Sequence, residues 1–283
     1  MKALLITLTL LFASPFTSAE PATTDSFDHQ HSLWNSLLQR HVHWIEGGVA
    51  SQVDYHGFKK DRASLDRYLA TLSDVDRDAF DRWSRDQRKA FLLNGYNAFT
   101  VKLILSKYPD VESIKDLGSF FSSPWSKQFF LIFGKQTSLD TIEHEMLRKP
   151  GAYDDPYIHI AVICASIGCP ALPNEAFRAG DIDRQLKRGM QRFLSDRSRN
   201  RFNPQSGRLE VSKVFDWYEA DFEQGDRGIH SLKGLLSRYA AQLSDNPHQQ
   251  LLIGEHKLEI DHLDYDWRLN DYSHKLEAGS ESN

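Results

Sequence analysis

Two neighbouring cysteines are the residues of this sequence best suited to covalent chemistry. Cys164 and Cys169 are the only cysteines in 283 residues, and four residues separate them. A thiol becomes a nucleophile when its thiolate is stabilised, commonly by a helix N-terminus or an imidazolium. Cys169 precedes Pro170, a favoured first residue of a helix, which would place its sulfur near unpaired amides. The spacing leaves three interpretations open: a catalytic thiol, a disulfide between the two cysteines, or plain packing.

The segment that ends in Cys164 predicts where the two thiols lie. Residues 158–164 read IHIAVIC, and their β-branched content is typical of a strand buried on both faces. Because side chains alternate along a strand, His159 would point away from Cys164. His159 is therefore predicted to be a poor partner for Cys164, within reach of Cys169 only if the loop folds back. A hydrogen-bonded core histidine is the alternative interpretation.

Glu143 and His144 are further candidates, on a predicted helix that precedes this segment. An imidazole close to a thiol can take its proton, so His144 is a candidate base and Glu143 a candidate group to orient it. Adjacent helical residues point about 100° apart, so one of the two can face a cleft while the other does not. A solvated imidazole near a helix end is the alternative for His144.

Two asparagines lie on the apolar face of a long predicted helix. Asn94 and Asn97 are three residues apart and therefore adjacent on the helix surface. A buried amide without partners costs about 1–3 kcal/mol, so each is predicted to hold a neighbouring loop in place. The alternative is that one of them orients a catalytic imidazole or donates to an oxyanion.

Composition and motifs argue against several other functions. The net charge of −5, with both signs mixed along the chain, gives no reason to expect nucleic acid or an anionic membrane as a partner. The histidines form no HExxH pattern, so we expect no metal. The sequence contains no G-x-G-x-x-G, P-loop or G-x-S-x-G motif, so we expect no cofactor.

The first residues predict export. Lys2, the apolar residues 3–13 and the small residues 17–19 form the three parts of a secretory signal peptide. No other stretch approaches the ~20 apolar residues of a membrane-spanning helix. We therefore expect a periplasmic or secreted protein. The predicted organisation is a signal peptide at 1–19, a flexible leader at 20–31, a single globular domain at 32–270 and a disordered tail at 271–283.

Hydrophobic periodicity predicts a mixed fold. Helices and strands follow one another without strict alternation, which is typical of the α+β class, with helices packed on a small, mainly antiparallel sheet. Helices are predicted at 32–45, 62–72, 85–107, 141–148, 181–194, 213–222 and 229–239. Besides the strand at 158–164, strand signals fall at 208–211 and in hairpins at 129–138 and 251–260.

Four segments carry a resemblance to a known family. FLLNGYNAFT, SLDTIEHEMLR, DPYIHIAVICASIGCPAL and KVFDWYEADF resemble, in this order, the family catalogued as domain of unknown function 547. The YDWRLN segment near the C-terminus extends the resemblance. The family's fold is thought to be similar to papain-like and transglutaminase-like cysteine hydrolases, which implies a thiol nucleophile and a histidine partner in a permuted chain order. The positions that match are Asn94, Asn97, Glu143, His144, His159, Cys164 and Cys169.

Two functions follow as expectations. The first is an exported cysteine-dependent hydrolase or transferase that acts on an amide or thioester of a small, peptide-like substrate. In it Cys164 or Cys169 is the nucleophile, His144 the base, and Glu143, Asn94 or Asn97 an orienting group or oxyanion donor. The alternative is a non-catalytic binding or scaffold domain whose two cysteines form a structural disulfide.

Overall fold

The computed structural model describes residues 27–119 and 122–272. The predicted signal peptide lies outside these residues. The α-helices are α1 (Ser32–His41), α2 (Tyr55–Lys60), α3 (Arg62–Ser73), α4 (Arg77–Arg82), α5 (Arg85–Leu105), α6 (Ile182–Ser195), α7 (Val214–Trp217), α8 (Leu232–Arg238), α9 (Ala240–Leu243) and α10 (Pro247–Gly254). A π-helix spans Thr141–Leu147, and 3-10 helices span Glu46–Gly48, Ile114–Leu117, Pro156–Ile160, Glu219–Phe222 and Asp226–Gly228.

The strands form three small sheets in the described residues. They are β1 (Val42–Ile45), β2 (Ala50–Val53), β3 (Phe130–Ile132), β4 (Lys135–Thr137), β5 (Arg201–Asn203), β6 (Arg208–Ser212) and β7 (Ile260–Leu263). The pairs β1–β2, β3–β4 and β5–β6 are antiparallel, and β7 joins β6 in parallel. The α+β class with mainly antiparallel pairing is confirmed, although the strands are spread over separate sheets.

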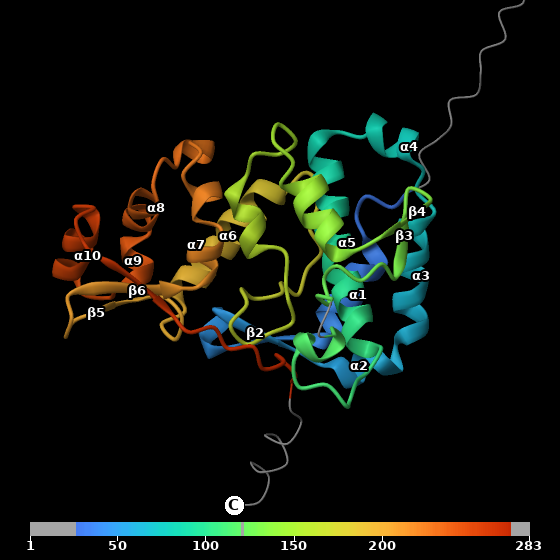
Figure 1. Cartoon of the computed structure of the whole chain (residues 1–283), viewed down its shortest axis with the longest axis horizontal. Helices are drawn as coiled ribbons and strands as arrows, with labels where there is room; N and C mark the ends of the chain where they lie inside the picture. The colour runs from blue at the N-terminus through green and yellow to red at the C-terminus, as the bar shows by residue number, and fades with distance from the viewer. Residues whose placement is uncertain (1–26, 120–121, 273–283) are drawn as a thin grey trace, which may run out of the picture.

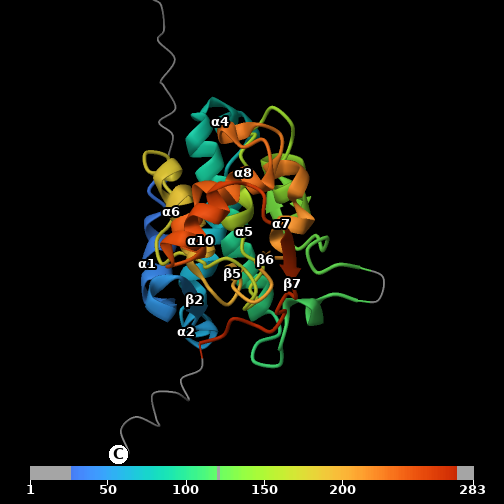
Figure 2. The same cartoon turned by 90° about the vertical axis from the view of Figure 1, so that its left-hand side faces the viewer.

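Helix α5 lies at the centre of the N-terminal half. A capping box fixes its start, because Ser84 and Gln87 each accept a hydrogen bond from the other's backbone amide. Most of its residues are buried; α2 and α3 pack against it, and α1 packs on α2 and α3 (Figure 1). At the other end of the molecule, α8, α9 and α10 pack together beside the β5–β6–β7 sheet (Figures 1 and 2). Buried apolar side chains from both halves form one continuous core.

The predicted buried strand at 158–164 is wrong. Pro156–Ile160 forms a 3-10 helix instead, and Asp155 caps it by accepting a hydrogen bond of 3.1 Å from the amide of Tyr157. The backbone that follows is held by a side chain rather than by a neighbouring strand. Asn97 donates to the carbonyl of Ala161 at 2.9 Å and accepts from the amide of Ile163 at 3.0 Å. These contacts satisfy the polar groups that a sheet would otherwise pair.

Two other elements also differ from the predictions. The helix expected at 32–45 ends at His41, and its last residues form β1. The hairpin expected at 251–260 is wrong, because Asn246 caps α10 and Pro247 occupies its first turn. The segment after α10 forms β7, which pairs with β6.

Both ends of the described chain pack on the domain. Phe27 contacts Trp83, and His31 is buried with its Nδ1 2.8 Å from the hydroxyl of Tyr68. Residues 27–31 are therefore ordered, although the sequence assigns them to a flexible leader. Near the C-terminus, Tyr272 stacks on His43, so residues 271 and 272 are likewise ordered rather than part of a disordered tail.

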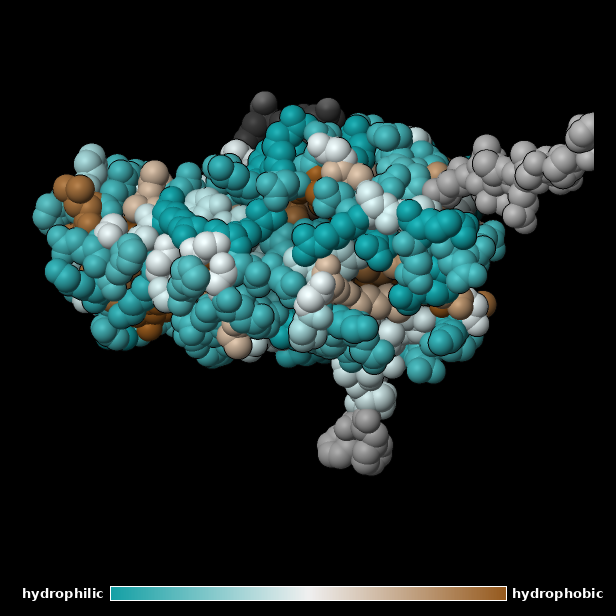
Figure 3. All heavy atoms as spheres, turned by 90° about the horizontal axis from the view of Figure 1, so that it is seen from above, coloured by the Kyte–Doolittle hydropathy of each residue, from teal (hydrophilic) through white to brown (hydrophobic). Residues whose placement is uncertain are grey.

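Hydrophilic side chains cover most of the face seen in Figure 3, and apolar ones show mainly in hollows between them. None of the helices in the described part of the chain has both the length and the apolar character needed to cross a membrane.

Candidate active site

A cavity of about 290 Å³ brings both cysteines together with two histidines. Cys164 and Cys169 come from the loop that follows the 3-10 helix Pro156–Ile160, and His159 comes from that helix itself. His144 comes from the π-helix, and Tyr218 follows α7. The cavity thus collects residues that lie far apart in the sequence.

The Cys164 thiol is surrounded by hydrogen-bonding groups. Its sulfur lies 2.9 Å from the Tyr265 hydroxyl and 3.1 Å from the Ser166 hydroxyl, and Ser166 also donates to Tyr265 at 3.0 Å. A hydrogen bond from the Cys169 thiol, together with those from Ser166 and Tyr265, lowers the pKa of Cys164 to about 7 against the opposing effect of burial. The lowered pKa increases the share of Cys164 that is thiolate at neutral pH.

The Cys169 thiol is the protonated partner of Cys164. Its side chain is buried, and its sulfur accepts a hydrogen bond of 3.0 Å from the backbone amide of Cys164. Burial, and then the neighbouring Cys164 thiolate, raise the pKa of Cys169 well above its usual value. Both cysteines are free thiols in the structure. Of the two predicted nucleophiles, Cys164 has the thiolate character and the partial exposure that the role requires.

The loop between the cysteines is held by the C-terminal segment. Ala165 has a φ of +60°, a conformation that costs about 1–2 kcal/mol for a residue with a side chain. The amides of Ile167 and Gly168 donate to the carbonyls of Arg268 and Asp266 at 2.8 Å each. A Cβ added at Gly168 would lie only 2.9 Å from the amide of Asp266, so only glycine permits this close approach.

The chain after β7 runs back across the molecule towards α2, and in doing so carries Tyr265 to the Cys164 sulfur (Figure 1). Its end is fixed by the Tyr55 hydroxyl, which donates to Asn270 at 2.8 Å. The polar and aromatic tail motif thus serves to position the nucleophile loop.

His159 is buried in the cavity wall and is oriented by a carboxylate. Its Nε2 lies 2.7 Å from Asp221 Oδ2, and its ring stacks on Tyr218 with centroids 3.7 Å apart. Because a carboxylate only accepts hydrogen bonds, this contact assigns the hydrogen to Nε2 and the lone pair to Nδ1. Nδ1 has no hydrogen-bond partner among the described residues. Burial lowers the pKa of His159, so the ring is neutral at pH 7 and can accept a proton.

Hydrogen bonds from Arg148 and His159 keep Asp221 in its carboxylate form. Arg148 Nε and Nη2 donate to its two oxygens at 2.7 and 3.1 Å. Burial alone would raise the pKa of Asp221, but the hydrogen bonds from His159 and Arg148 hold it well below its usual range. Asp221 can therefore stabilise an imidazolium that forms at His159.

The prediction that a strand turns His159 away from Cys164 does not apply to the 3-10 helix found here. His159 and Cys164 line the same cavity, although no hydrogen bond joins them in the described structure. Catalytic hydrogen bonds are often long before substrate binds.

His144 and Glu143 occupy less direct positions. His144 is 44% exposed, and its Nδ1 accepts a hydrogen bond of 2.7 Å from Arg148. Glu143 is buried and accepts from the hydroxyls of Tyr218 at 2.8 Å and Tyr96 at 3.2 Å. Both line the cavity, but Glu143 acts on the histidine indirectly, by fixing the Tyr218 ring on which His159 stacks.

Asn94 and Asn97 do not line the cavity. Asn94 donates to the carbonyl of Phe177 at 2.8 Å and accepts from its amide at 3.0 Å, in the same way as Asn97 holds Ala161 and Ile163. Both therefore hold neighbouring loops, and Asn97 holds the one that leads directly to Cys164. Neither is placed to donate to an oxyanion at the thiol.

Sequence reasoning missed the groups that complete the site. Asp221 and Tyr265 are 62 and 101 residues from their partners His159 and Cys164, too far apart for any local pattern to connect them. They do lie in segments already noted for the family resemblance, KVFDWYEADF and YDWRLN. The family resemblance of those two segments was the feature of the sequence that could have pointed to Asp221 and Tyr265.

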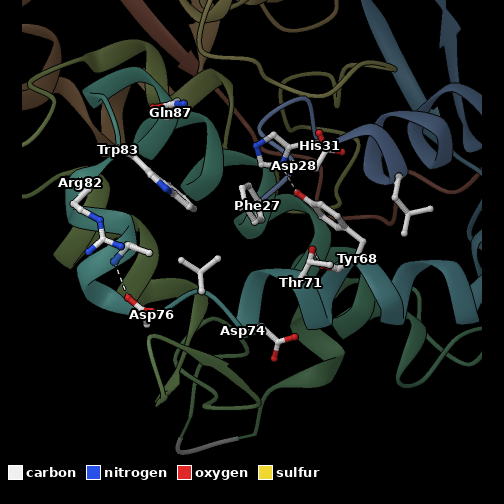
Figure 4. Close-up of a pocket in the computed structure, with 13 residues that line it drawn as sticks. Phe27, Asp28, His31, Tyr68, Thr71, Asp74, Asp76, Arg82, Trp83 and Gln87 are labelled. Atoms are coloured by element: carbon white, nitrogen blue, oxygen red, sulfur yellow. Dashed lines mark hydrogen bonds between the residues drawn. The ribbon is translucent and has the colours of Figure 1, made fainter. Parts of the chain in front are cut away.

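A larger cavity of about 650 Å³ lies between α3, α4, the start of α5 and the first described residues (Figure 4). Phe27, Tyr68 and Trp83 line it, with Asp74 and Asp76. It contains none of the predicted site residues. Among the residues that the structure describes, no three His, Cys, Asp or Glu side chains are grouped so that they could hold a metal ion.

The comparisons with known proteins concern the segment that carries the cysteines. Residues 80–194 match the model of a family described as protein of unknown function, DUF547. No curated protein and no solved structure matches the chain. The matched segment includes α5, His159, Cys164 and Cys169, whereas Asp221 and Tyr265 follow it. The predicted family resemblance is thereby confirmed over residues 80–194.

Proposed function

We propose that this protein is an exported cysteine-dependent hydrolase or transferase that acts on an amide or thioester of a peptide-like substrate. One observation carries the proposal: a thiol with its pKa lowered to about 7 shares a cavity with a neutral histidine that a carboxylate orients. Nucleophile, base and orienting group are the three parts of a thiol-based acyl transfer site. The similarity to papain-like hydrolases that the family resemblance implies is part of the proposal.

The three groups have defined roles in the proposed reaction. His159 Nδ1 accepts the Cys164 proton, and the sulfur attacks the substrate carbonyl to form a tetrahedral oxyanion. Asp221 stabilises the imidazolium, which then protonates the departing amine or thiol as its bond to carbon breaks. The remaining acyl thioester is cleaved by water, or by another nucleophile, whose proton returns to His159.

Tyr265 and Ser166 would act at two stages of this cycle. Both hydroxyls contact the Cys164 sulfur before attack, where they stabilise the thiolate. Once the sulfur has bonded to carbon, the negative charge moves to the adjacent oxygen. We propose that the Tyr265 hydroxyl then donates to that oxygen, as a group of an oxyanion hole does, and that Ser166 supports it through its hydrogen bond to Tyr265.

The proposed export rests on the first nineteen residues of the sequence. Their basic start, apolar middle and small residues before Glu20 have the order of a cleavable signal peptide. In the periplasm or outside the cell, the protein would meet extracytoplasmic peptide-like substrates.

The experiment that tests the function uses an activated acyl donor. The protein is incubated with the neutral thioester phenyl thioacetate, thiophenol release is followed, and the intact protein is weighed after rapid acid quenching. We expect release above the uncatalysed rate and a single acetyl group on the peptide that contains Cys164. Release at the rate of buffer alone, with no acetylated protein, would contradict the proposal.

A non-catalytic domain with a Cys164–Cys169 disulfide is the second candidate. The hydrogen bond between the Cys164 amide and the Cys169 sulfur favours it, because it keeps the two cysteines adjacent. Alkylation of protein from its native compartment under denaturing conditions, which expose both sulfurs, and before reduction separates the two functions. Two alkylated cysteines support the enzyme, whereas a full population without alkylation supports the scaffold.

A further inference from the structure

Charge is distributed unevenly around the proposed active site. The carboxylates of Asp140 and Glu143 line the cavity, and no lysine or arginine is among its lining residues. Arg148 contacts two of the lining residues, with Nη1 2.7 Å from His144 Nδ1 and its guanidinium 5.0 Å from the Tyr218 ring centroid, and its charge is paired with the Asp221 carboxylate. The charged side chains that line the cavity are thus acidic, which favours a cationic ligand.

Asp140 is the carboxylate most available to such a ligand. Its side chain is 37% exposed, and its one ion-pair contact in the described chain is to His144 Nε2 at 3.9 Å. Glu143, in contrast, is buried and already accepts two tyrosine hydroxyls. Asp140 therefore retains acceptor capacity that faces the cavity.

Aromatic rings make up much of the remaining lining of the cavity. Trp217 packs against Trp267 with centroids 5.6 Å apart and against Tyr265 at 4.8 Å, and Trp125 meets Trp267 at 5.9 Å. Trp217 is 44% exposed, so much of its ring is free to contact a ligand. Ring faces of this kind attract ammonium and guanidinium groups.

The chain itself provides an example of that attraction. The Lys115 ammonium lies 3.7 Å from the centroid of Trp267, one of the rings that line the cavity. Lys115 is not a lining residue, so it occupies part of the aromatic cluster without filling the cavity. An aromatic cluster that already binds one ammonium is suited to bind a second on its cavity side.

Resting on the acyl transfer proposed above, we infer that the substrate carries an ammonium or guanidinium group close to its scissile carbonyl. The cation lies between the Asp140 carboxylate and the face of Trp217, while the carbonyl lies at the Cys164 sulfur. Substrates of this class include peptides with a basic side chain or a free amine next to the bond that is cleaved. An anionic group at the same place would be repelled.

Two charged thiol reagents test the inference without requiring turnover. The cationic reagent is 2-(trimethylammonium)ethyl methanethiosulfonate, and the anionic one is 2-sulfonatoethyl methanethiosulfonate. In both, the Cys164 thiolate attacks the sulfenyl sulfur, a new disulfide forms, and methanesulfinate leaves. The rate of each is measured by intact mass at low ionic strength, because salt screens charge, and is divided by its rate with N-acetylcysteine amide.

We expect the normalised rate of the cationic reagent to exceed that of the anionic reagent by at least about tenfold. Asp140→Asn should reduce this ratio several-fold. Asp78→Asn is the matched control, because it makes the same charge change at an exposed position on α4 outside the cavity, and should leave the ratio unchanged. The Cys164→Ser protein should take up neither reagent at this site.

The outcomes separate this inference from the proposed function. Equal normalised rates, or a ratio that Asp78→Asn lowers as much as Asp140→Asn, would overturn the charge preference even if phenyl thioacetate acylates Cys164. A tenfold preference that Asp140→Asn removes, without any acylation, would overturn the acyl transfer and with it the assignment of the cation to a substrate.

Discussion

Replacing Cys164 with serine is expected to reduce kcat/KM for thioester hydrolysis by at least about 10³-fold, because removal of a covalent nucleophile leaves only residual catalysis by binding and polarisation. The serine hydroxyl keeps the contacts to Tyr265 and Ser166 but does not ionise near neutral pH. The measurement is thiophenol release from phenyl thioacetate at pH 7, with thermal unfolding to confirm that the variant is folded.

Cys169→Ala gives the matched comparison. It removes the hydrogen bond that contributes most to lowering the pKa of Cys164. The pKa of Cys164 should therefore rise above 7, the thiolate fraction at pH 7 should fall, and activity should recover as the pH is raised. If Cys164→Ser retained activity while Cys169→Ala lost it at every pH, the nucleophile would be Cys169.

The second large effect is expected at His159 and Asp221. His159→Gln removes the proton acceptor and should lower kcat by about 10²–10⁴-fold. Asp221→Asn should cause a loss of similar size, because an amide neither fixes the His159 tautomer nor stabilises the imidazolium. Since a missing base affects the chemical step rather than binding, KM should change much less than kcat.

His144→Gln is the control for this prediction. His144 lines the same cavity, but its Nδ1 is occupied by Arg148 and its ring is 44% exposed. We expect its kcat to stay within about threefold of the unaltered protein, a change far below that of a lost general base. A larger loss with His144→Gln than with His159→Gln would restore His144 as the base.

The regular elements could be predicted because their periodicity is local. The helices α3, α5 and α6, strand β6 and the β3–β4 hairpin lie close to their predicted ranges. The segment at 158–164 could not, since its β-branched composition is typical of a strand while its backbone partner is the Asn97 side chain. The local composition of the segment cannot reveal a hydrogen bond to a side chain 64 residues away.

Part of the candidate site could also be predicted from local features of the sequence. Cys164 and Cys169 stand out as the only cysteines, and the structure brings them to one cavity with His144 and His159. The choice between His144 and His159 depended on the strand predicted at 158–164, which does not form. In that strand the His159 side chain would have pointed away from Cys164. Tyr265, which contacts Cys164, and Asp221, which contacts His159, are brought in by tertiary packing alone.

We expect the Cys164 thiol to ionise near neutral pH and to be reachable from the cavity. The rate of its alkylation by iodoacetamide, followed by intact mass from pH 5 to pH 10, tests this most directly. Because the folded pKa lies below the usual value, the rate should be low in acid and rise through a midpoint near pH 7. A midpoint at about 8.5 or above, the value of an ordinary thiol, or no alkylation at any pH, would contradict the account.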